Sequence, residues 1–318
     1  MKISGFSMAK NAAKLYYPVK ESVMSILPIV DEFIFALGDC DEDDNTRELL
    51  ESINSDKIKI VDTVWDTVKN IKGSEYARQT DIAKEQCTGD WLFYLQADEV
   101  VHEKDIPVIK NRCKELLNDK EVEGLLFNYL HFWGDYNHYH ISHGWYKNEI
   151  RIIRNIPETH SWQDAQSFRK IPEFDASLYL KKEGTQKLKV ARSGANIYHY
   201  GWVRPPSMMK IRNTTFNIYY HGKKAIEERK ENEKYKLELF DYGPLNSLPE
   251  FKQNHPKIMA SKIKDFYWKN ELQYHGKINK QRVKHKHEKF KNRIITCFER
   301  IIGKPLFEFE NYILLKNR

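Results

Sequence analysis

The first part of the chain alternates short apolar runs with segments that repeat apolar positions every three or four residues. The apolar runs have the length and continuity of buried strands and cover residues 2–8, 31–39, 57–65 and 91–96. The periodic segments predict helices over residues 11–27, 46–53, 74–87 and 105–119. Alternating strands and helices of this kind predict an α/β fold, with a mostly parallel sheet covered by helices on both faces.

The pattern changes from about Gly124 onward. Strands rich in aromatic residues are predicted over residues 124–136, 148–156, 177–184 and 187–202. Helices are then predicted over residues 207–220, 225–240, 258–270 and 287–302. Prolines stop strands and restart helices, so the "RPP" at 204–206 predicts a boundary between a domain of residues 1–205 and a mainly helical region of residues 206–318.

Charge is divided unevenly between these two parts. Residues 1–205 hold 27 Lys and Arg against 32 Asp and Glu, whereas residues 206–318 hold 25 against 13. A basic second part indicates contact with something anionic, and a solvated helical face is the alternative. The four cysteines form no C-x-x-C pair, and no secretory leader or membrane span is predicted. A cytoplasmic protein is therefore expected.

Polar side chains follow two of the predicted strands. "WLFYLQADE" ends its apolar run with Gln96 and Asp98, which point to one side of a strand, while Glu99 points to the other. Asp39 ends the run over 31–39. Ligands of parallel sheets bind beyond the carboxyl ends of strands, so Asp39 is placed to accept hydrogen bonds from a base or ribose, and Asp98 to bind Mg²⁺ or Mn²⁺. Helix capping by Asp98 and a solvated loop around Asp39 are the alternatives.

Motifs in a fixed order resemble the family 2 glycosyltransferases of the GT-A fold. "GDW" followed by "YLQADEVVHE" resembles the D-x-D segment of that family. "KISGFSMAKN" resembles its first strand and Asn-bearing turn, and "ILPIVDEFIFALGDCDEDDNT" its second strand. "ARQTDIAKEQCTGDW" resembles the helix with a basic residue, "HSWQDAQSFR" the segment with the catalytic acid, and "ANIYHYGWVR" the late His strand. The resemblance covers roughly residues 1–205 and implies a GT-A, Rossmann-like fold.

The resemblance also implies a reaction and a set of residues. The expected reaction is inverting transfer of a sugar from a nucleotide-diphospho-sugar to a hydroxyl of a glycan, lipid-linked or protein-linked acceptor, assisted by Mn²⁺ or Mg²⁺. Asp164 is the expected catalytic base, and Asp98 and His199 are the expected metal ligands. The substrate-binding residues implied are Asn11, Asp39, Arg78, Gln96, Trp162 and Arg204.

One departure from the family pattern affects the metal. The first position of D-x-D is Gln96, which is not a carboxylate, so the metal rests on Asp98, the diphosphate oxygens and His199. The Gln96 amide can instead hydrogen-bond the ribose. The charge of the leaving diphosphate is assigned to the metal and to Arg151, Arg154 or Arg204, since arginine suits diphosphate.

Two other functions remain open at this stage. Gln96 leaves room for a catalytically inactive scaffold that binds sugar nucleotides. The basic second part suggests a nucleic-acid-binding protein, but the acidic first part and the absence of RNA-binding signatures argue against a nucleic-acid partner.

Two segments outside the motifs have expected roles. "FERIIGKPLFEFENYILL" is expected to pack on the catalytic domain, with a homo-oligomer contact or a peripheral contact with an anionic membrane as alternatives. "HFWGDYNHYHISHGW" is interpreted as an aromatic acceptor-binding region, and "KHKHEK" at 284–289 as a solvated helix face.

Overall fold

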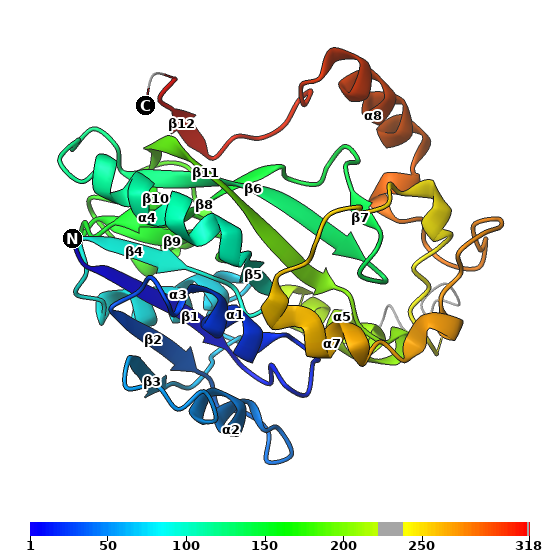
Figure 1. The fold of residues 1–318 in the computed structure, drawn as a ribbon, viewed down its shortest axis with the longest axis horizontal. Coiled ribbons are helices and arrows are strands. Elements are labelled where there is room, and N and C mark those ends of the chain that lie inside the picture. The colour runs from blue at the N-terminus through cyan, green and yellow to red at the C-terminus, as the bar shows by residue number, and fades with distance from the viewer. Residues whose placement is uncertain (222–237, 317) are drawn as a thin grey trace.

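A mixed β-sheet with helices packed against it forms the centre of the protein (Figure 1). The structure is a computed structural model that describes residues 1–221, 238–316 and 318. The sheet order is β3-β2-β1-β4-β8-β6-β11, followed by β10 and β9. The main strands are β1 (Ile3–Ala9), β2 (Glu32–Leu37), β3 (Ile58–Asp62), β4 (Trp91–Tyr94), β6 (Gly124–Trp133), β8 (Asn148–Arg154) and β11 (Gln186–Trp202).

Most of these strands run in one direction. β3, β2, β1 and β4 are joined by parallel pairings. β8 is antiparallel to both β4 and β6, so β6 again runs in the direction of β1, and β11 is parallel to β6. This arrangement confirms the predicted α/β class with a mostly parallel sheet. The carboxyl ends of β1, β4, β6 and β11 therefore lie along one edge.

Helices cover both faces of the sheet, as predicted. Four of them come from the first part of the chain: α1 (Val19–Ile26), α2 (Thr46–Glu51), α3 (Ser74–Glu85) and α4 (Ile106–Glu115). Side chains alternate between the faces, so Phe33 and Phe93 pack in a core with α1, α2 and α4. Phe6 and Tyr94 point to the opposite core, which α3 shares with Phe168 of the hairpin described next.

Several short elements differ from the prediction. The strand predicted over 177–184 is wrong, because Ala176–Leu180 form a 3₁₀ helix whose start is capped by the Asp175 side chain. Short strands that the sequence pattern missed are β5 (Glu99–Val101), β7 (Tyr139–His140), β9 (Thr159–Trp162) and β10 (Ser167–Lys170). β9 and β10 form an antiparallel hairpin, and β5 pairs with β11. Further 3₁₀ helices span Glu103–Asp105, Leu245–Ser247, Lys257–Met259, Trp268–Glu271 and Lys286–Glu288.

Much of the last part of the chain packs at the carboxyl ends of β6 and β11, and its final strand pairs with residues near the start of β11. Its elements are α5 (Pro206–His221), α7 (Ala260–Lys264), α8 (Phe290–Ile302) and β12 (Tyr312–Leu314), which pairs with β11 (Figure 1). Met209, Tyr242 and Trp268 share a core with Trp133 and Tyr200. Most of the helix predicted over 225–240 lies outside the described residues, and the division at 205/206 stays a prediction. Among the described residues, no helix is long and apolar enough to cross a membrane.

Candidate active site

A cavity of about 440 Å³ lies at the carboxyl edge of the sheet. Strands β1, β4, β6 and β11 contribute Lys10, Gln96, Asp98, Trp133, His199 and Trp202 to its wall, from the strands or the turns that follow them. Helix α5 contributes Arg212, Thr215, Phe216 and Tyr219. Residues after the "RPP" therefore complete a cavity that the sheet alone would leave open.

Asp98 lies near the middle of this edge, in the turn between β4 and β5. Its side chain is 9% exposed, and its carbonyl oxygen accepts a hydrogen bond of 2.8 Å from the Tyr200 amide. Its Oδ2 lies 3.5 Å from Nε2 of His199. Burial works against the charged form, but His199 and Arg212 outweigh it and hold the pKa of Asp98 at about 2. Asp98 is thus a carboxylate at neutral pH.

Hydrogen bonds behind His199 determine which ring nitrogen faces Asp98. Nδ1 of His199 lies 3.0 Å from Nδ1 of His131, whose Nε2 lies 2.7 Å from the Tyr146 carbonyl oxygen. Burial lowers the pKa of His131 well below its usual value, so this ring is neutral. A carbonyl only accepts, so His131 donates through Nε2 and accepts through Nδ1 from His199. Nε2 of His199 is then the nitrogen directed at Asp98.

This pair fits a divalent cation that is shared with a substrate. A carboxylate oxygen and an imidazole nitrogen 3.5 Å apart need a proton or a cation between them. A Cβ on Gly201 would lie 2.4 Å from Asp98 Oδ2 and 2.7 Å from His199 Nε2, so only glycine keeps that space open. The described residues include no cluster of three or more metal-binding side chains. The remaining ligands would have to be substrate phosphates and water.

Gln96 holds a neighbouring loop in place. Its Nε2 donates to the Ala165 carbonyl at 3.1 Å, while Nη1 of Arg151 donates to the Gln166 carbonyl at 2.8 Å. Arg151 is itself fixed by two bonds to the buried carboxylate of Glu99, at 2.7 and 2.8 Å. These donors tie the β9–β10 loop to the turn after β4. The side chain of an aspartate has no N–H group and could not donate to the Ala165 carbonyl, which accounts for an amide side chain at position 96.

Asp164 lies in this loop and lines the cavity. The residues on either side of it have positive φ angles, 57° for Gln163 and 61° for Ala165. The hydroxyl of Tyr220, at the end of α5, donates to Oδ2 of Asp164. Burial and the adjacent carboxylate raise the pKa of Tyr220, so the phenol keeps its proton and the carboxylate accepts.

Arg212 is a cationic residue of the cavity that the sequence interpretation missed. Its Nε donates to the Tyr17 hydroxyl at 3.2 Å, and its guanidinium lies over the rings of Trp202 and Phe216, 5.1 and 4.7 Å from their centroids. One arginine in a basic helical region carries no signal of its own. Only the fold shows that this side of α5 faces Asp98.

The arginines proposed for the leaving group have other partners. Arg151 binds Glu99, and Arg154 donates to the carbonyls of Leu116 and Val122. Arg204 is fully buried and donates to the Gly201 carbonyl at 2.9 Å. None of the three is among the described residues that line the cavity.

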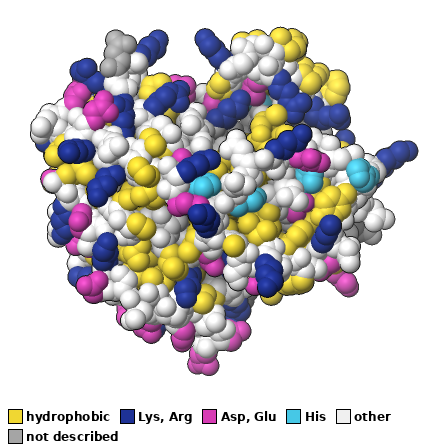
Figure 2. All heavy atoms as spheres, viewed as in Figure 1, with side chains coloured by type: hydrophobic (Ala, Val, Ile, Leu, Met, Phe, Trp, Pro, Cys, Tyr) yellow, Lys and Arg dark blue, Asp and Glu magenta, His cyan; other side chains and the backbone are white. Residues whose placement is uncertain are grey.

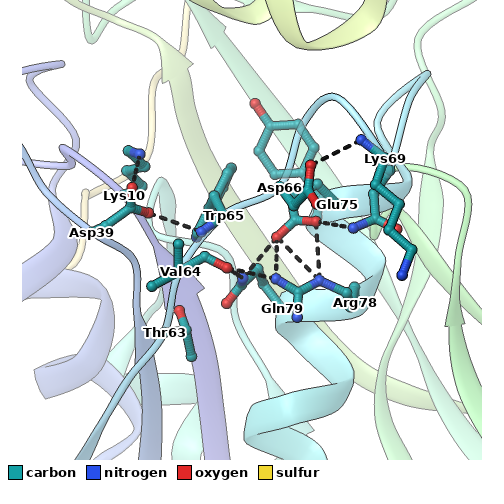
Figure 3. A network of polar contacts seen from close by, with 12 residues as sticks. Lys10, Asp39, Thr63, Val64, Trp65, Asp66, Lys69, Glu75, Arg78 and Gln79 are labelled. Carbon is teal, nitrogen blue, oxygen red and sulfur yellow. Dashed lines mark hydrogen bonds and ion pairs between the residues drawn. The ribbon is translucent and has the colours of Figure 1, made fainter.

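Four further predicted residues are not among the described residues that line the cavity. Asp39 binds Nζ of Lys10 at 2.7 Å and the amide of Trp65 at 2.9 Å, and both partners line the cavity (Figure 3). Arg78 binds Glu75 and the Val64 carbonyl, in the network that holds the loop after β3 (Figure 3).

The other two of these residues, Asn11 and Trp162, bind the backbone. Asn11 accepts from the Asp41 amide at 2.8 Å, and Trp162 donates to the Lys181 carbonyl at 2.8 Å. Gln96, Asp98, Asp164 and His199 are the predicted residues that the cavity brings together.

The "KHKHEK" segment contributes to the cavity and is not a solvated helix face. His285, Lys286 and His287 line it, and His287 is 8% exposed. Nζ of Lys286 donates to the Gly144 carbonyl at 2.9 Å. This segment lies against the aromatic residues of "HFWGDYNHYHISHGW", since the rings of Trp133 and His285 meet edge to face with their centroids 5.1 Å apart.

Glu149 predicts a pH dependence of stability. It is 5% exposed, accepts from Nε2 of Gln166 at 2.7 Å, and burial raises its pKa from 4.5 to about 7. The folded state thus favours the protonated acid. Above pH 4.5 the unfolded chain gives up this proton while the folded protein retains it, so stability falls as the pH rises toward 7. The loss is on the order of 3 kcal/mol at pH 8.

We expect Glu149→Gln to remove this penalty. Urea unfolding should show a variant more stable than wild type at pH 8 and a difference that shrinks toward pH 4.5. Glu158→Gln, on the loop after β8, is the matched control and is measured over the same pH range. A constant difference at every pH would contradict a raised pKa.

Comparison with solved structures gives distant matches. No protein-family model and no curated protein matches the chain. One solved structure that matches is glucosyl-3-phosphoglycerate synthase from Mycobacterium tuberculosis in complex with Mn²⁺, UDP and phosphoglyceric acid. The match has 17% sequence identity and a TM-score of 0.28, and it covers 42% of this chain and 43% of that chain. S. aureus TarS matches at 12% identity, over 73% of this chain and 42% of that chain, with a TM-score of 0.34. The chain spans less than half of each, and such similarity identifies no activity.

Proposed function

We propose that the protein is a glycosyltransferase that takes its sugar from a nucleotide-diphospho-sugar. The observation that supports this most is the pair of Asp98 and His199 in the middle of a cavity at the carboxyl edge of the sheet, with Asp164 and Arg212 in the same wall. Nucleotides bind at this edge in open α/β sheets. The ordered motifs of residues 1–205 support the same function independently of the cavity.

The strand order suggests how the donor lies. The nucleoside is assigned to the side of β1, β2 and β3, where the rings of Trp65 and Tyr219 lie 5.7 Å apart and offer a base a stacking surface. The diphosphate is assigned to Asp98, His199 and Arg212. A Mn²⁺ or Mg²⁺ ion bound by Asp98, His199 and the donor phosphates would neutralise the charge that develops on the leaving diphosphate.

The acceptor is assigned to the wall formed by Trp133, Trp145 and the segment 285–287. Aromatic faces suit the apolar faces of sugar rings, and Lys286 can hydrogen-bond hydroxyl or anionic groups. A glycan or a lipid-linked glycan fits this chemistry. In the inverting reaction, Asp164 accepts the proton of the acceptor hydroxyl. At the same time, the oxygen of that hydroxyl bonds to the anomeric carbon of the donor sugar. The bond from that carbon to the diphosphate breaks on the opposite face, and Arg212 binds the departing diphosphate.

A donor-turnover assay tests this proposal. The full chain is incubated with UDP-, GDP- and TDP-sugars, with Mn²⁺ or with a chelator, and release of nucleoside diphosphate is measured. We expect one donor class to be hydrolysed slowly to free sugar with Mn²⁺ and to be spared with the chelator. A donor that binds but is never cleaved, with or without simple glycoside acceptors, would favour the inactive scaffold. Failure of every donor to bind would contradict both.

A further inference from the structure

Helix α8 presents an apolar stripe to the solvent. The stripe consists of Phe290, Ile294, Phe298 and Ile301, which are 78, 40, 54 and 82% exposed. Spacings of four, four and three residues place them on one face of the helix. In Figure 2, hydrophobic side chains lie at the surface in the region of α8, among Lys and Arg side chains. The expected packing of this segment on the catalytic domain does not occur through these residues.

The opposite face of α8 fixes the direction of the stripe. Oγ1 of Thr296 accepts from the His143 amide at 2.9 Å. Oε1 of Glu299 lies 3.0 Å from Nδ1 of His143 and accepts from the Leu306 amide at 2.8 Å. Both Thr296 and Glu299 are buried. The helix is therefore held to the protein by its polar side, and its apolar side faces outward.

Within segment 284–304, every exposed charged side chain is basic. All seven basic residues of segment 284–304 are exposed: Lys284, Lys286, Lys289, Lys291, Arg293, Arg300 and Lys304. The two acids of this segment are buried and paired, Glu288 with Arg282 at 2.7 Å and Glu299 with His143 at 3.0 Å. At 100° per residue, Lys291 flanks the stripe on one side, and Arg293 and Arg300 flank it on the other.

We propose that α8 docks on an anionic lipid surface. The stripe would enter the boundary between headgroups and acyl chains, with the flanking basic residues on the lipid phosphates, as amphipathic helices with basic flanks do. Charge complementarity selects this occupant over a second copy of the chain, because the copy would bring an equally basic surface against this one. The α8 helix begins three residues after His287, so docking would hold the cavity wall close to the membrane.

Co-sedimentation of the full chain with vesicles tests the docking. Vesicles of phosphatidylcholine with 30% phosphatidylserine are compared with pure phosphatidylcholine at low and high salt. We expect at least tenfold stronger binding to the anionic vesicles at low salt, and most of it lost at high salt. Two double variants should each weaken the binding at least tenfold. One combines Phe298→Ser with Ile301→Ser, and the other combines Lys291→Glu with Arg300→Glu.

Matched controls lie on α4, where Val108 is exposed and Lys110 and Lys114 are exposed basic residues. Val108→Ser, and Lys110→Glu with Lys114→Glu, should bind vesicles as the wild type does. If Lys110→Glu with Lys114→Glu loses as much vesicle binding as the α8 charge variant, the binding depends on net charge alone, and the assignment to α8 is overturned. No anionic preference, or a dimer in light scattering that Phe298→Ser dissociates, would overturn it too. The result is independent of donor turnover, so failure here leaves the proposed function standing.

Discussion

Replacing Asp98 by alanine is expected to lower donor turnover by a factor on the order of a hundred to a thousand. The carboxylate lies 3.5 Å from Nε2 of His199, and its low pKa keeps it charged. Without it, one imidazole nitrogen is left to share a cation with the diphosphate. The fold should survive, because the backbone bond from Tyr200 to the Asp98 carbonyl does not involve the side chain. Turnover is measured by release of nucleoside diphosphate from the best donor.

Asp62→Asn serves as the control for this variant. Asp62 ends β3 and its side chain is 74% exposed. The substitution therefore removes a carboxylate from the same sheet without changing the cavity. Its turnover should match the wild type. Wild-type turnover in Asp98→Ala, with unchanged circular dichroism, would remove Asp98 from the site.

Asp164→Asn is expected to stop transfer and leave donor binding intact. The amide has nearly the shape of the carboxylate but cannot take up the acceptor proton, so transfer should fall by a factor of about 10² to 10⁴. The assay compares the donor dissociation constant with the rate of transfer. The second expected signature is that slow hydrolysis of the donor by water falls together with transfer.

Tyr220→Phe separates proton transfer from positioning. Tyr220 donates to Oδ2 of Asp164, so its loss frees one carboxylate oxygen but leaves the base present. A modest loss, far smaller than in Asp164→Asn, is expected. If Asp164→Asn transfers at nearly the wild-type rate, the base is another residue, and the buried Glu149 beside Gln166 would be the next to test.

The parts of the site that the sequence predicts are those set by strand ends. Asp98 follows β4 and His199 lies near the carboxyl end of β11, two strands with a clear apolar pattern, and parallel strands bring their carboxyl ends to one edge. Gln96 could be placed at that edge but not explained, because its partner Ala165 is 69 residues away and belongs to a hairpin with no periodic signal.

The parts that the sequence did not predict depend on which way a charged side chain turns. Arg151 and Arg204 are typical diphosphate ligands by residue type, yet one is paired with buried Glu99 and the other with backbone carbonyls. Arg212 and His287 line the cavity because α5 and the segment 285–287 pack over it. The composition of segment 284–289 favours a solvated helix face, and a single arginine in the basic second part of the chain does not show which way it points.

The central claim is that Asp98 and His199 bind a cation together with a nucleotide diphosphate. The melting temperature of the full chain, measured with UDP-, GDP- and TDP-sugars, with Mn²⁺ and then with a chelator, tests it most directly, because a ligand that binds only the folded state raises that temperature. We predict that one nucleotide class raises it with Mn²⁺, that the chelator removes most of the rise, and that Asp98→Ala shows little of it. An equal rise in Asp98→Ala, or no rise with any nucleotide, would contradict the account.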